Sequence, residues 1–533
     1  MREVEIIVGL LAVVVVLVLL ARRLGVPYPI PLVLGGLALG FVPGLPPVAM
    51  PPELVLLVFL PPLLYSESIS LSWRDFQANL RPISLLSLGL VAVTTAVVAW
   101  TAHAVVPGLP WPAAFVLGAI VAPTDEVAVA AVAQRLSIPQ RLLVIIEAES
   151  LVNDAVSLVL YRLAVTAVLT GAFSWLSGGF QFLLASFGGV GIGLAVGVCI
   201  FWIRRRLTPD PLIENTISLL TPFMSYLPAE TLHVSGVLAV VTTGLYMGRQ
   251  APRYVTSATR LQAGALWGMI DFLLNSLLFI LLGLQLHPIL NRLAGRPWTS
   301  LVFEAAAVSL CVILTRIAWV VVETTLPRLL TRRRTPAAQV PWQHVAVVAW
   351  TGIRGGISLA AALAIPLLTG RGASFPQRDM LIFLTFGVIL STLVIQGISL
   401  PVLIGKLNLS EDDAVAREES EARLKASQAG LARLEEIARS EPLPREIVED
   451  LREHSTNRMQ RYQARTLGNA NDDYEQRAAI YRRLRYEMVE AQRKTIVGLR
   501  DRSEISDDVL QRLQRTLDHE EQRLETEEVG DEL

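Results

Sequence analysis

Acidic and amide side chains gather in the stretch EAESLVNDAVSLVLY, residues 147–161, which otherwise has the character of an apolar helix. It supplies Glu149, Ser150, Asn153 and Asp154. A charged group at the centre of a bilayer costs roughly 2.5–3.5 kcal/mol on insertion scales, so acids in such a segment are paired or functional. An aspartate among serine and asparagine oxygens suits a hard monovalent cation, because hard cations prefer oxygen ligands.

Two further stretches place a charge beside a helix break. In APTDEVAVAAV, residues 122–132, Pro123 removes a backbone donor and Asp125 follows it closely. In GIRGGISLAAALAIP, residues 352–366, three glycines surround Arg354, and glycine weakens a helix. Breaks beside charges, one in each half of a membrane protein, are typical of transporters with inverted repeats. We therefore expect an ion site where the two breaks meet.

The polar residues of the first stretch have two interpretations. Helical spacing places Glu149 near Asn153 and Ser150 near Asp154, so a broad polar face should point toward the protein interior. Glu149 and Asn153 could lock helices together through hydrogen bonds and an arginine partner. Asp154 is either a member of a structural pair or the carrier of a cation.

Charges of opposite sign recur at similar depth in the chain. At 1.5 Å per helical residue, Asp125 and Asp154 lie about 15 and 20 Å from the inner ends of their spans. Asp271, Arg316 and Arg354 are similarly far from any loop. Opposite charges at one depth indicate mutual compensation inside the protein.

The elements that position these residues are apolar runs, thirteen of which are long enough, or nearly so, to cross a hydrocarbon core of about 30 Å. They lie at 4–22, 28–41, 52–68, 82–105, 112–134, 140–170, 179–204, 211–227, 231–249, 259–287, 299–325, 341–369 and 378–405. With the N-terminus outside, the inner loops hold 16 arginines and the outer loops hold 4, which fits the positive-inside rule. We predict an all-α polytopic membrane protein of about 13 spans, an inverted repeat in which spans five and twelve are discontinuous and cross.

Composition separates this part of the chain from a charged tail. The 533 residues are 53% hydrophobic, too apolar for an ordinary soluble surface. Residues 1–410 hold 25 Lys and Arg against 17 Asp and Glu, whereas residues 411–533 hold 21 against 30. We expect a transmembrane domain over 1–405 and a cytoplasmic helical tail over 406–533. The tail is either a solvated appendage or a regulatory or dimer-forming element.

Taken in order, five stretches resemble the sodium/proton exchanger family of the monovalent cation/proton antiporter superfamily, and most of all its bacterial branch marked by an Asn-Asp pair. They are APTDEVAVAAV, EAESLVNDAVSLVLY, FLLNSLLFILLGLQL (272–286), TRIAWV (315–320) and GIRGGISLAAALAIP. The resemblance implies alternating-access exchange of Na⁺, K⁺ or Li⁺ for H⁺ across the cell membrane, serving pH homeostasis. It implies a homodimer in the bilayer and no cofactor, and we expect no nucleic-acid partner.

The resemblance also implies roles for individual residues. Asp154 would be the essential carrier of cation and proton. Asp125, the carbonyl of Thr124 and the hydroxyl of Ser150 would complete the cation coordination. Asn153 would hold the crossing region and mark electroneutral, one-for-one exchange.

The chain departs from the family pattern at two places. Ser66 stands where an acid often follows LPPLLY, so Glu67, the next residue, becomes a candidate cavity acid. Glu126 replaces a frequent proline and is a second candidate cavity acid, which either alters the ion selectivity or faces another helix. The remaining implied residues are Glu149 and Arg354 as a structural pair, and Asn275 and Arg316 at family positions without an assigned role.

Two other functions could use a similar design. A Na⁺-coupled transporter of an organic solute would need a deep pocket with aromatic walls, which spans five and six do not offer. A cation channel would pass current, whereas electroneutral exchange would not. The HExxH, GxSxG and GxxxxGK[ST] motifs are absent from the sequence, so we do not expect an enzyme.

Overall fold

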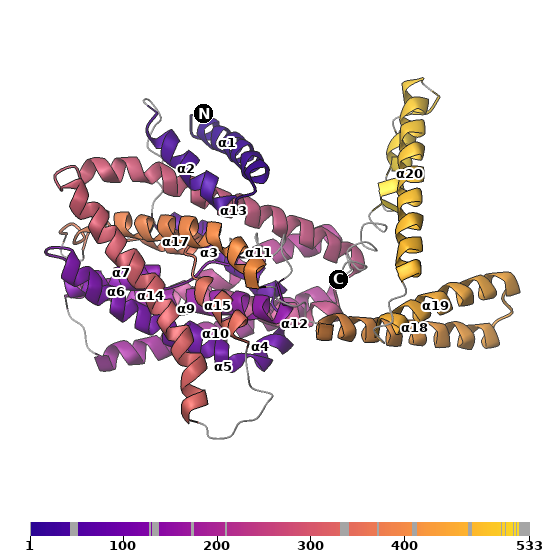
Figure 1. Ribbon diagram of the computed structural model, residues 1–533, viewed down its shortest axis with the longest axis horizontal. Helices are drawn as coiled ribbons and strands as arrows, with labels where there is room; N and C mark the ends of the chain where they lie inside the picture. The colour runs from indigo at the N-terminus through magenta and orange to yellow at the C-terminus, as the bar shows by residue number, and fades with distance from the viewer. Residues whose placement is uncertain are drawn as a thin grey trace. The chain divides into compact units, whose positions relative to one another are not determined.

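The computed structural model describes residues 2–42, 52–126, 129, 138–171, 175–207, 210–330, 341–369, 372–407, 413–466 and 472–521, apart from 503, 507, 515 and 519. The chain divides into two compact units, Met1–Leu409 and Ser410–Leu533. Within the described residues both units are helical (Figure 1), and extended pairing is limited to one isolated bridge between Leu368 and Ser374. The all-α prediction is therefore confirmed for this part of the chain.

The helices of the first unit follow the predicted apolar runs. They are α1 (Arg2–Leu24), α2 (Pro29–Gly40), α3 (Pro52–Ser70), α4 (Trp73–Ala78), α5 (Leu80–Ser84), the π-helix η1 (Leu85–Leu90), α6 (Val91–Val105), α7 (Trp111–Val121), α9 (Gln140–Thr170), α10 (Trp175–Arg206), α11 (Pro211–Thr231), α12 (Gly236–Gln250), the short 3₁₀ turn η2 (Ala251–Arg253), α13 (Ser257–Arg292), α14 (Trp298–Leu330), α15 (Trp342–Trp350), α16 (Gly356–Leu363) and α17 (Arg378–Leu407).

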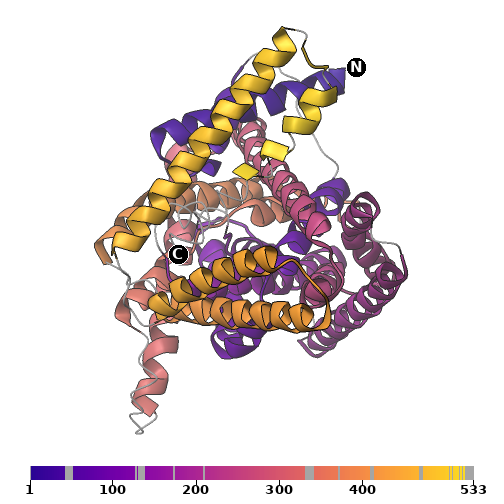
Figure 2. The same ribbon diagram turned by 90° about the vertical axis from the view of Figure 1, so that its right-hand side faces the viewer.

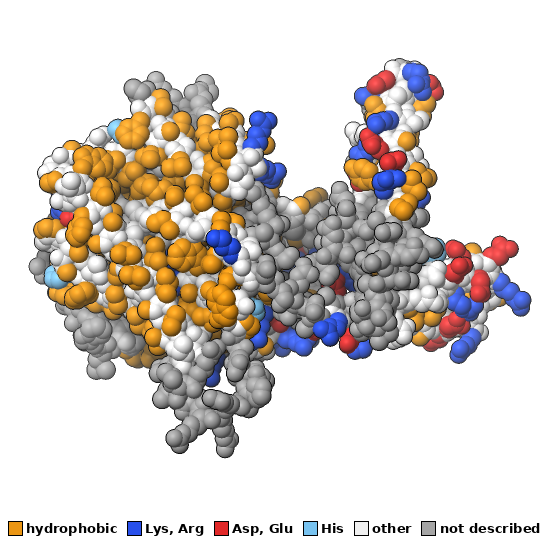
Figure 3. Space-filling model, in the orientation of Figure 1, with side chains coloured by type: hydrophobic (Ala, Val, Ile, Leu, Met, Phe, Trp, Pro, Cys, Tyr) orange, Lys and Arg blue, Asp and Glu red, His pale blue; other side chains and the backbone are white. Residues whose placement is uncertain are grey.

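Length and composition suit several of these helices to a bilayer. Among the described residues, five are long and apolar enough to cross one: Leu80–Val105, Gly178–Arg206, Ser257–Arg292, Trp298–Thr325 and Arg378–Leu407. Hydrophobic side chains are spread over the described surface of the first unit that faces the viewer in Figure 3, with few charged groups among them. Such a surface suits the hydrocarbon core of a membrane. The count of thirteen spans remains a prediction.

Predicted span five is interrupted near its middle. Helix α7 ends at Val121, two residues before Pro123, because proline cannot continue the hydrogen-bond ladder and disfavours helix at the residue before it. The chain is not helical from 122 to 126. The rest of this predicted span, residues 127–134 apart from 129, lies outside the described residues.

Predicted span twelve consists of two short helices. Residues 351–355, which include two of the three glycines, are not helical and separate α15 from α16. Helix α16 ends at Leu363, so the continuous helix expected up to residue 369 is absent here. The backbone N–H of Asp125 donates to the carbonyl of Ile353 over 2.8 Å, so the two interruptions contact each other. That bond satisfies buried backbone groups freed by both breaks.

Helix α9 occupies the predicted limits of span six. Its start follows Pro139, and Gly171 in the left-handed region (φ 71°) ends it by donating its N–H to Ala167. This conformation is easily adopted only by glycine, which explains the sharp end. The helix packs against α7, η1 and α10.

The second unit contains charged amphipathic helices. Helices α18 (Asp413–Ser440) and α19 (Arg445–Thr466) form an antiparallel hairpin, and the segment SEPLP, residues 440–444, ends the first helix and leads to the second (Figure 2). Helix α20 (Asp472–Asp501) follows, and Val489 and Leu517 pack together with Ile496 beside them. The hydroxyl oxygen of Ser506 caps the last helical segment by accepting the backbone N–H of Val509 at 3.4 Å.

Candidate cation-binding site

A small cavity lies between α9 and the two interruptions. Its volume is about 10 Å³, which is room for about one water molecule or one bare cation. Its walls come from α3, the break after α7, α9, α13 and the start of α16. They are Leu63, Glu67, Pro123, Thr124, Asp125, Ser150, Asp154, Asn275, Gly355, Gly356, Ile357 and Ser358.

Asp154 lines this cavity from α9. The residue is only 2% exposed, yet none of the described residues forms a hydrogen bond or ion pair with its carboxylate. The bond recorded at this position joins the Ser157 hydroxyl to the Asp154 backbone carbonyl. A buried carboxylate without a partner needs a proton or a cation to neutralise it.

Asp125 is held by the opposite interruption. Its Oδ2 atom accepts the backbone N–H of Gly356 at 3.1 Å, the first residue of α16. Negative charge at a helix N-terminus is stabilised by the unpaired N–H groups and the helix dipole. An added Cβ atom at Gly355 would lie 1.2 Å from the same carboxylate oxygen, so only glycine leaves room for Asp125. The sequence indicated flexible glycines here but not this close approach.

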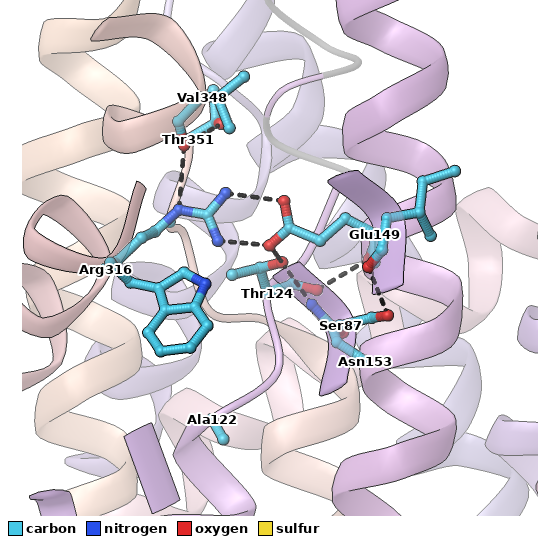
Figure 4. A network of polar contacts seen from close by, with 12 residues as sticks. Ser87, Ala122, Thr124, Glu149, Asn153, Arg316, Val348 and Thr351 are labelled. Atoms are coloured by element: carbon cyan, nitrogen blue, oxygen red, sulfur yellow. Dashed lines mark hydrogen bonds and ion pairs between the residues drawn. The ribbon is translucent and has the colours of Figure 1, made fainter. Parts of the chain in front are cut away.

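Thr124 connects the break to Glu149 and Asn153 on the polar face of α9 (Figure 4). Its carbonyl accepts the Ser150 hydroxyl at 2.8 Å. Its hydroxyl oxygen accepts the Asn153 amide at 2.8 Å and donates to a Glu149 oxygen at 3.4 Å. Together with Asp154, these α9 side chains are at most 2% exposed, so the predicted inward polar face is confirmed.

The partner of Glu149 is Arg316, and the expected pairing with Arg354 is wrong. The Nη2 atom of Arg316 lies 3.0 Å from Oε2 of Glu149, and Nη1 contacts the other carboxylate oxygen (Figure 4). The Arg316 Nε atom donates to the Val348 carbonyl in the last turns of α15 at 3.1 Å. Arg316 and Arg354 lie at similar distances from the loops in the sequence, so the sequence could not tell which of them pairs with Glu149. The packing of the helices determines that choice.

Arg354 instead satisfies backbone carbonyls. Its guanidinium donates to Val121 at 2.9 Å and Ala122 at 3.3 Å, and also to Gly352 in its own break. Helix α7 ends there without further intrahelical donors, and a cation at a helix C-terminus also complements the dipole. The break after α7 therefore provides Arg354 with its partners.

Three more carboxylates surround the cavity region. Glu67 lines the cavity, and one of its oxygens is buried without a hydrogen-bond partner among the described residues. Glu126, the other candidate cavity acid, is not among the residues that line the cavity, and one of its buried oxygens likewise receives no hydrogen bond from the part of the chain that the structure describes. Asp271 on α13 accepts the Ser66 hydroxyl, a contact that sequence reasoning missed because the two residues are far apart in the chain. Ser358 also lines the cavity and was not predicted from the sequence. Its position two residues after Gly356, close to the interruption, was the available signal.

The fold and the site together define a class of protein. Interrupted helices whose ends carry compensating charges, around a small oxygen-lined cavity, are typical of secondary ion transporters. The chain belongs to the sodium/hydrogen exchanger family: residues 9–406 match the family described as "sodium/hydrogen exchanger, transmembrane". The family is one of membrane transport proteins.

Similar proteins carry matching names. A Na⁺/H⁺ exchanger of Mycobacterium tuberculosis is 39% identical over 97% of this chain and 96% of its own length. A sodium, potassium, lithium and rubidium/H⁺ antiporter of Bacillus pumilus is 35% identical over 74% of this chain and 61% of its own. The solved sodium proton antiporter MjNhaP1 of Methanocaldococcus jannaschii is 18% identical, with a TM-score of 0.60 over 76% of this chain and 99% of that one, which supports the fold.

Proposed function

We propose that this chain exchanges one monovalent cation for one proton across the cell membrane, with both ions competing for Asp154. The observation that carries the proposal is the buried carboxylate of Asp154, which receives no hydrogen bond or ion pair from the described residues, in a cavity that Asp125, Ser150 and Thr124 also line. These oxygens are the ligand types that hard cations prefer. Na⁺ is the cation that the family name indicates, and K⁺ and Li⁺ fit the same ligand types.

Coupling follows from charge neutrality at this site. One carboxylate cannot hold a proton and a metal ion in the same position at once. Either ion neutralises Asp154, whereas the empty, ionised site would carry its charge through a region of low dielectric at high cost. Asp125 is held by the N-terminus of α16, so we assign it to cation coordination and Asp154 to the exchange itself. Alternating access of the loaded site then requires no ATP.

The other cavity residues have supporting roles in this proposal. Glu67 offers a further oxygen beside the cation path, and Asn275 closes the cavity from α13. Asn153 and Glu149 hold the break after α7 through Thr124, and Arg316 and Arg354 hold the ends of α15 and α7. In this proposal the cation is coordinated by Asp154, Asp125, Ser150 and Thr124.

Topology and assembly belong to the same proposal. We propose thirteen spans in an inverted repeat, with the interrupted spans crossing at the cavity. The arginine distribution between loops supports an outer N-terminus and a cytoplasmic tail. We propose a homodimer, as the family resemblance implies, with the tail outside the exchange pathway.

The size of the cavity argues against the main alternative. An organic solute typically occupies a pocket of about 300–1,000 Å³, whereas this cavity admits roughly one water-sized particle. A cation channel differs in a measurable way, because channel flux would carry current and respond to membrane voltage.

Exchange by reconstituted protein tests the proposal. Proteoliposomes with an internal pH dye should alkalinise or acidify when a Na⁺ gradient is imposed, without generating a membrane potential. Asp154→Asn should abolish the signal while the purified protein stays folded and inserted. The matched control is Asp75→Asn, because Asp75 is an exposed acid on α4. Exchange that persists in Asp154→Asn contradicts the assignment.

A further inference from the structure

Three polar residues form a stripe along α17 beside the interruption between α15 and α16. Thr392, Gln396 and Ser399 are spaced by four and three residues, which places them on one face of the helix. The hydroxyl oxygen of Thr392 accepts the backbone N–H of Arg354 at 3.1 Å. The hydroxyl oxygen of Ser399 accepts the indole N–H of Trp350 at 2.8 Å. The two outer members of the stripe are therefore bonded to the interrupted helix.

Gln396, the middle member, is not bonded. Its exposure is 0%, and neither its amide nitrogen nor its amide oxygen has a hydrogen-bond partner among the described residues. An added Cβ atom at the neighbouring Gly397 would lie within 4.0 Å of Ile30 and Ile353, both apolar. The large majority of buried side-chain polar atoms in proteins are hydrogen-bonded, so a buried amide with both ends unpaired requires an explanation.

Buried hydroxyl groups on the same helix, α17, do find hydrogen-bond partners, so the position of Gln396 on this helix does not by itself explain its unpaired amide. Thr385 and Thr392 donate to backbone carbonyls of the preceding turn, at 2.9 Å each. The longer glutamine side chain cannot reach that bond so readily, and it depends on a partner from another element. A partner that is missing in one state of a transporter can be supplied in another, because alternating access changes which groups face each other.

We propose that Gln396 is a positioning residue of the transport cycle. Its side-chain amide lacks a hydrogen-bond partner among the described residues in the present state. In the opposite-access state it bonds to the displaced interruption between α15 and α16. The amide destabilises the present access state, in which it is unpaired, and stabilises the opposite-access state, in which it is paired. The two access states are therefore close in free energy. This inference rests on the proposed exchange function, since it requires two access states.

The test is Gln396→Met, an apolar side chain of similar length, measured for melting temperature and for exchange. Removing an unpaired amide should raise the melting temperature of the purified protein. The maximal exchange rate in proteoliposomes should fall several-fold, with the Na⁺ concentration at half-maximal rate unchanged. The matched control is Thr385→Val, which removes a fully buried hydroxyl bonded within its own helix and should leave the rate near that of the wild type.

Opposite changes in stability and rate are the signature of the proposal, because loss of a merely structural residue lowers both. A lowered melting temperature would show that the amide is already paired, for example with a buried water molecule, and would overturn the inference. An unchanged exchange rate would overturn it as well. The melting measurement does not depend on transport, whereas absence of exchange in the wild-type protein contradicts the proposed function itself.

Discussion

The ion pair between Glu149 and Arg316 allows a quantitative test of how the interrupted helices are held. Both side chains are 1% exposed, and two nitrogen–oxygen contacts join them. Arg316→Met should leave Glu149 as a buried charge without its ion-pair partner, with the Thr124 hydroxyl as its remaining donor, and should also leave the Val348 carbonyl without its donor. Breaking a buried pair on one side typically costs about 3–5 kcal/mol of stability.

Removing the second charge should recover much of this loss. The double variant Glu149→Gln with Arg316→Met should be destabilised by less than the sum of the single variants, with a coupling energy of about 2–3 kcal/mol. Arg354 provides the matched comparison, since it is another fully buried arginine at the same level. Its bonds go to carbonyls, so the Glu149–Arg354 cycle should give a coupling below about 1 kcal/mol.

The measurement is the free energy of unfolding of the four proteins in each cycle, from denaturant titrations in mixed micelles. Helical content of the folded baselines must agree between variants, so that loss of stability is not confused with misfolding. A Glu149–Arg354 coupling equal to or larger than the Glu149–Arg316 coupling would refute this account of the site.

Further predictions concern the glycine break, the end of α7 and the tail. Gly355→Ala should strongly reduce exchange by displacing the carboxylate of Asp125, whereas Gly405→Ala, where no other atom lies within 4 Å of the added carbon, should be neutral in the same liposome assay. Arg354→Met should lower the free energy of unfolding by about 1–3 kcal/mol for each carbonyl left without a donor, as measured by denaturant titration. Leu517→Ala should destabilise the packing of the tail by about 2 kcal/mol, seen as faster limited proteolysis there, with exchange unchanged.

Proline and glycine residues that end or interrupt helices determined much of the fold. Pro123 ended α7, Gly171 ended α9, and the glycines beside Arg354 separated α15 from α16. Each of these acts through the conformation of one or two residues, so the signal is readable without the tertiary structure. The convergence of both breaks and α9 on one cavity followed from their common depth in the predicted spans.

Partners between distant helices could not be read in the same way. Arg316 and Arg354 are equivalent by depth, and the carbonyls of Val121 and Ala122 that hold Arg354 have no signature in the side-chain sequence. The contact of Ser66 with Asp271 joins residues 205 positions apart. Such contacts depend on helix rotation and packing, which apolar runs do not specify.

The most direct test of the central claim is proton release on cation binding. When Na⁺ is added to purified protein in weak buffer at a pH where Asp154 is protonated, the wild type should release one proton for each cation bound, because a ligand must be deprotonated to bind metal. Asp154→Asn should release none, and series with K⁺ and Li⁺ should rank the cations by the same signal. Cation binding to the wild type without proton release, or equal release by Asp154→Asn, would contradict competition at this carboxylate.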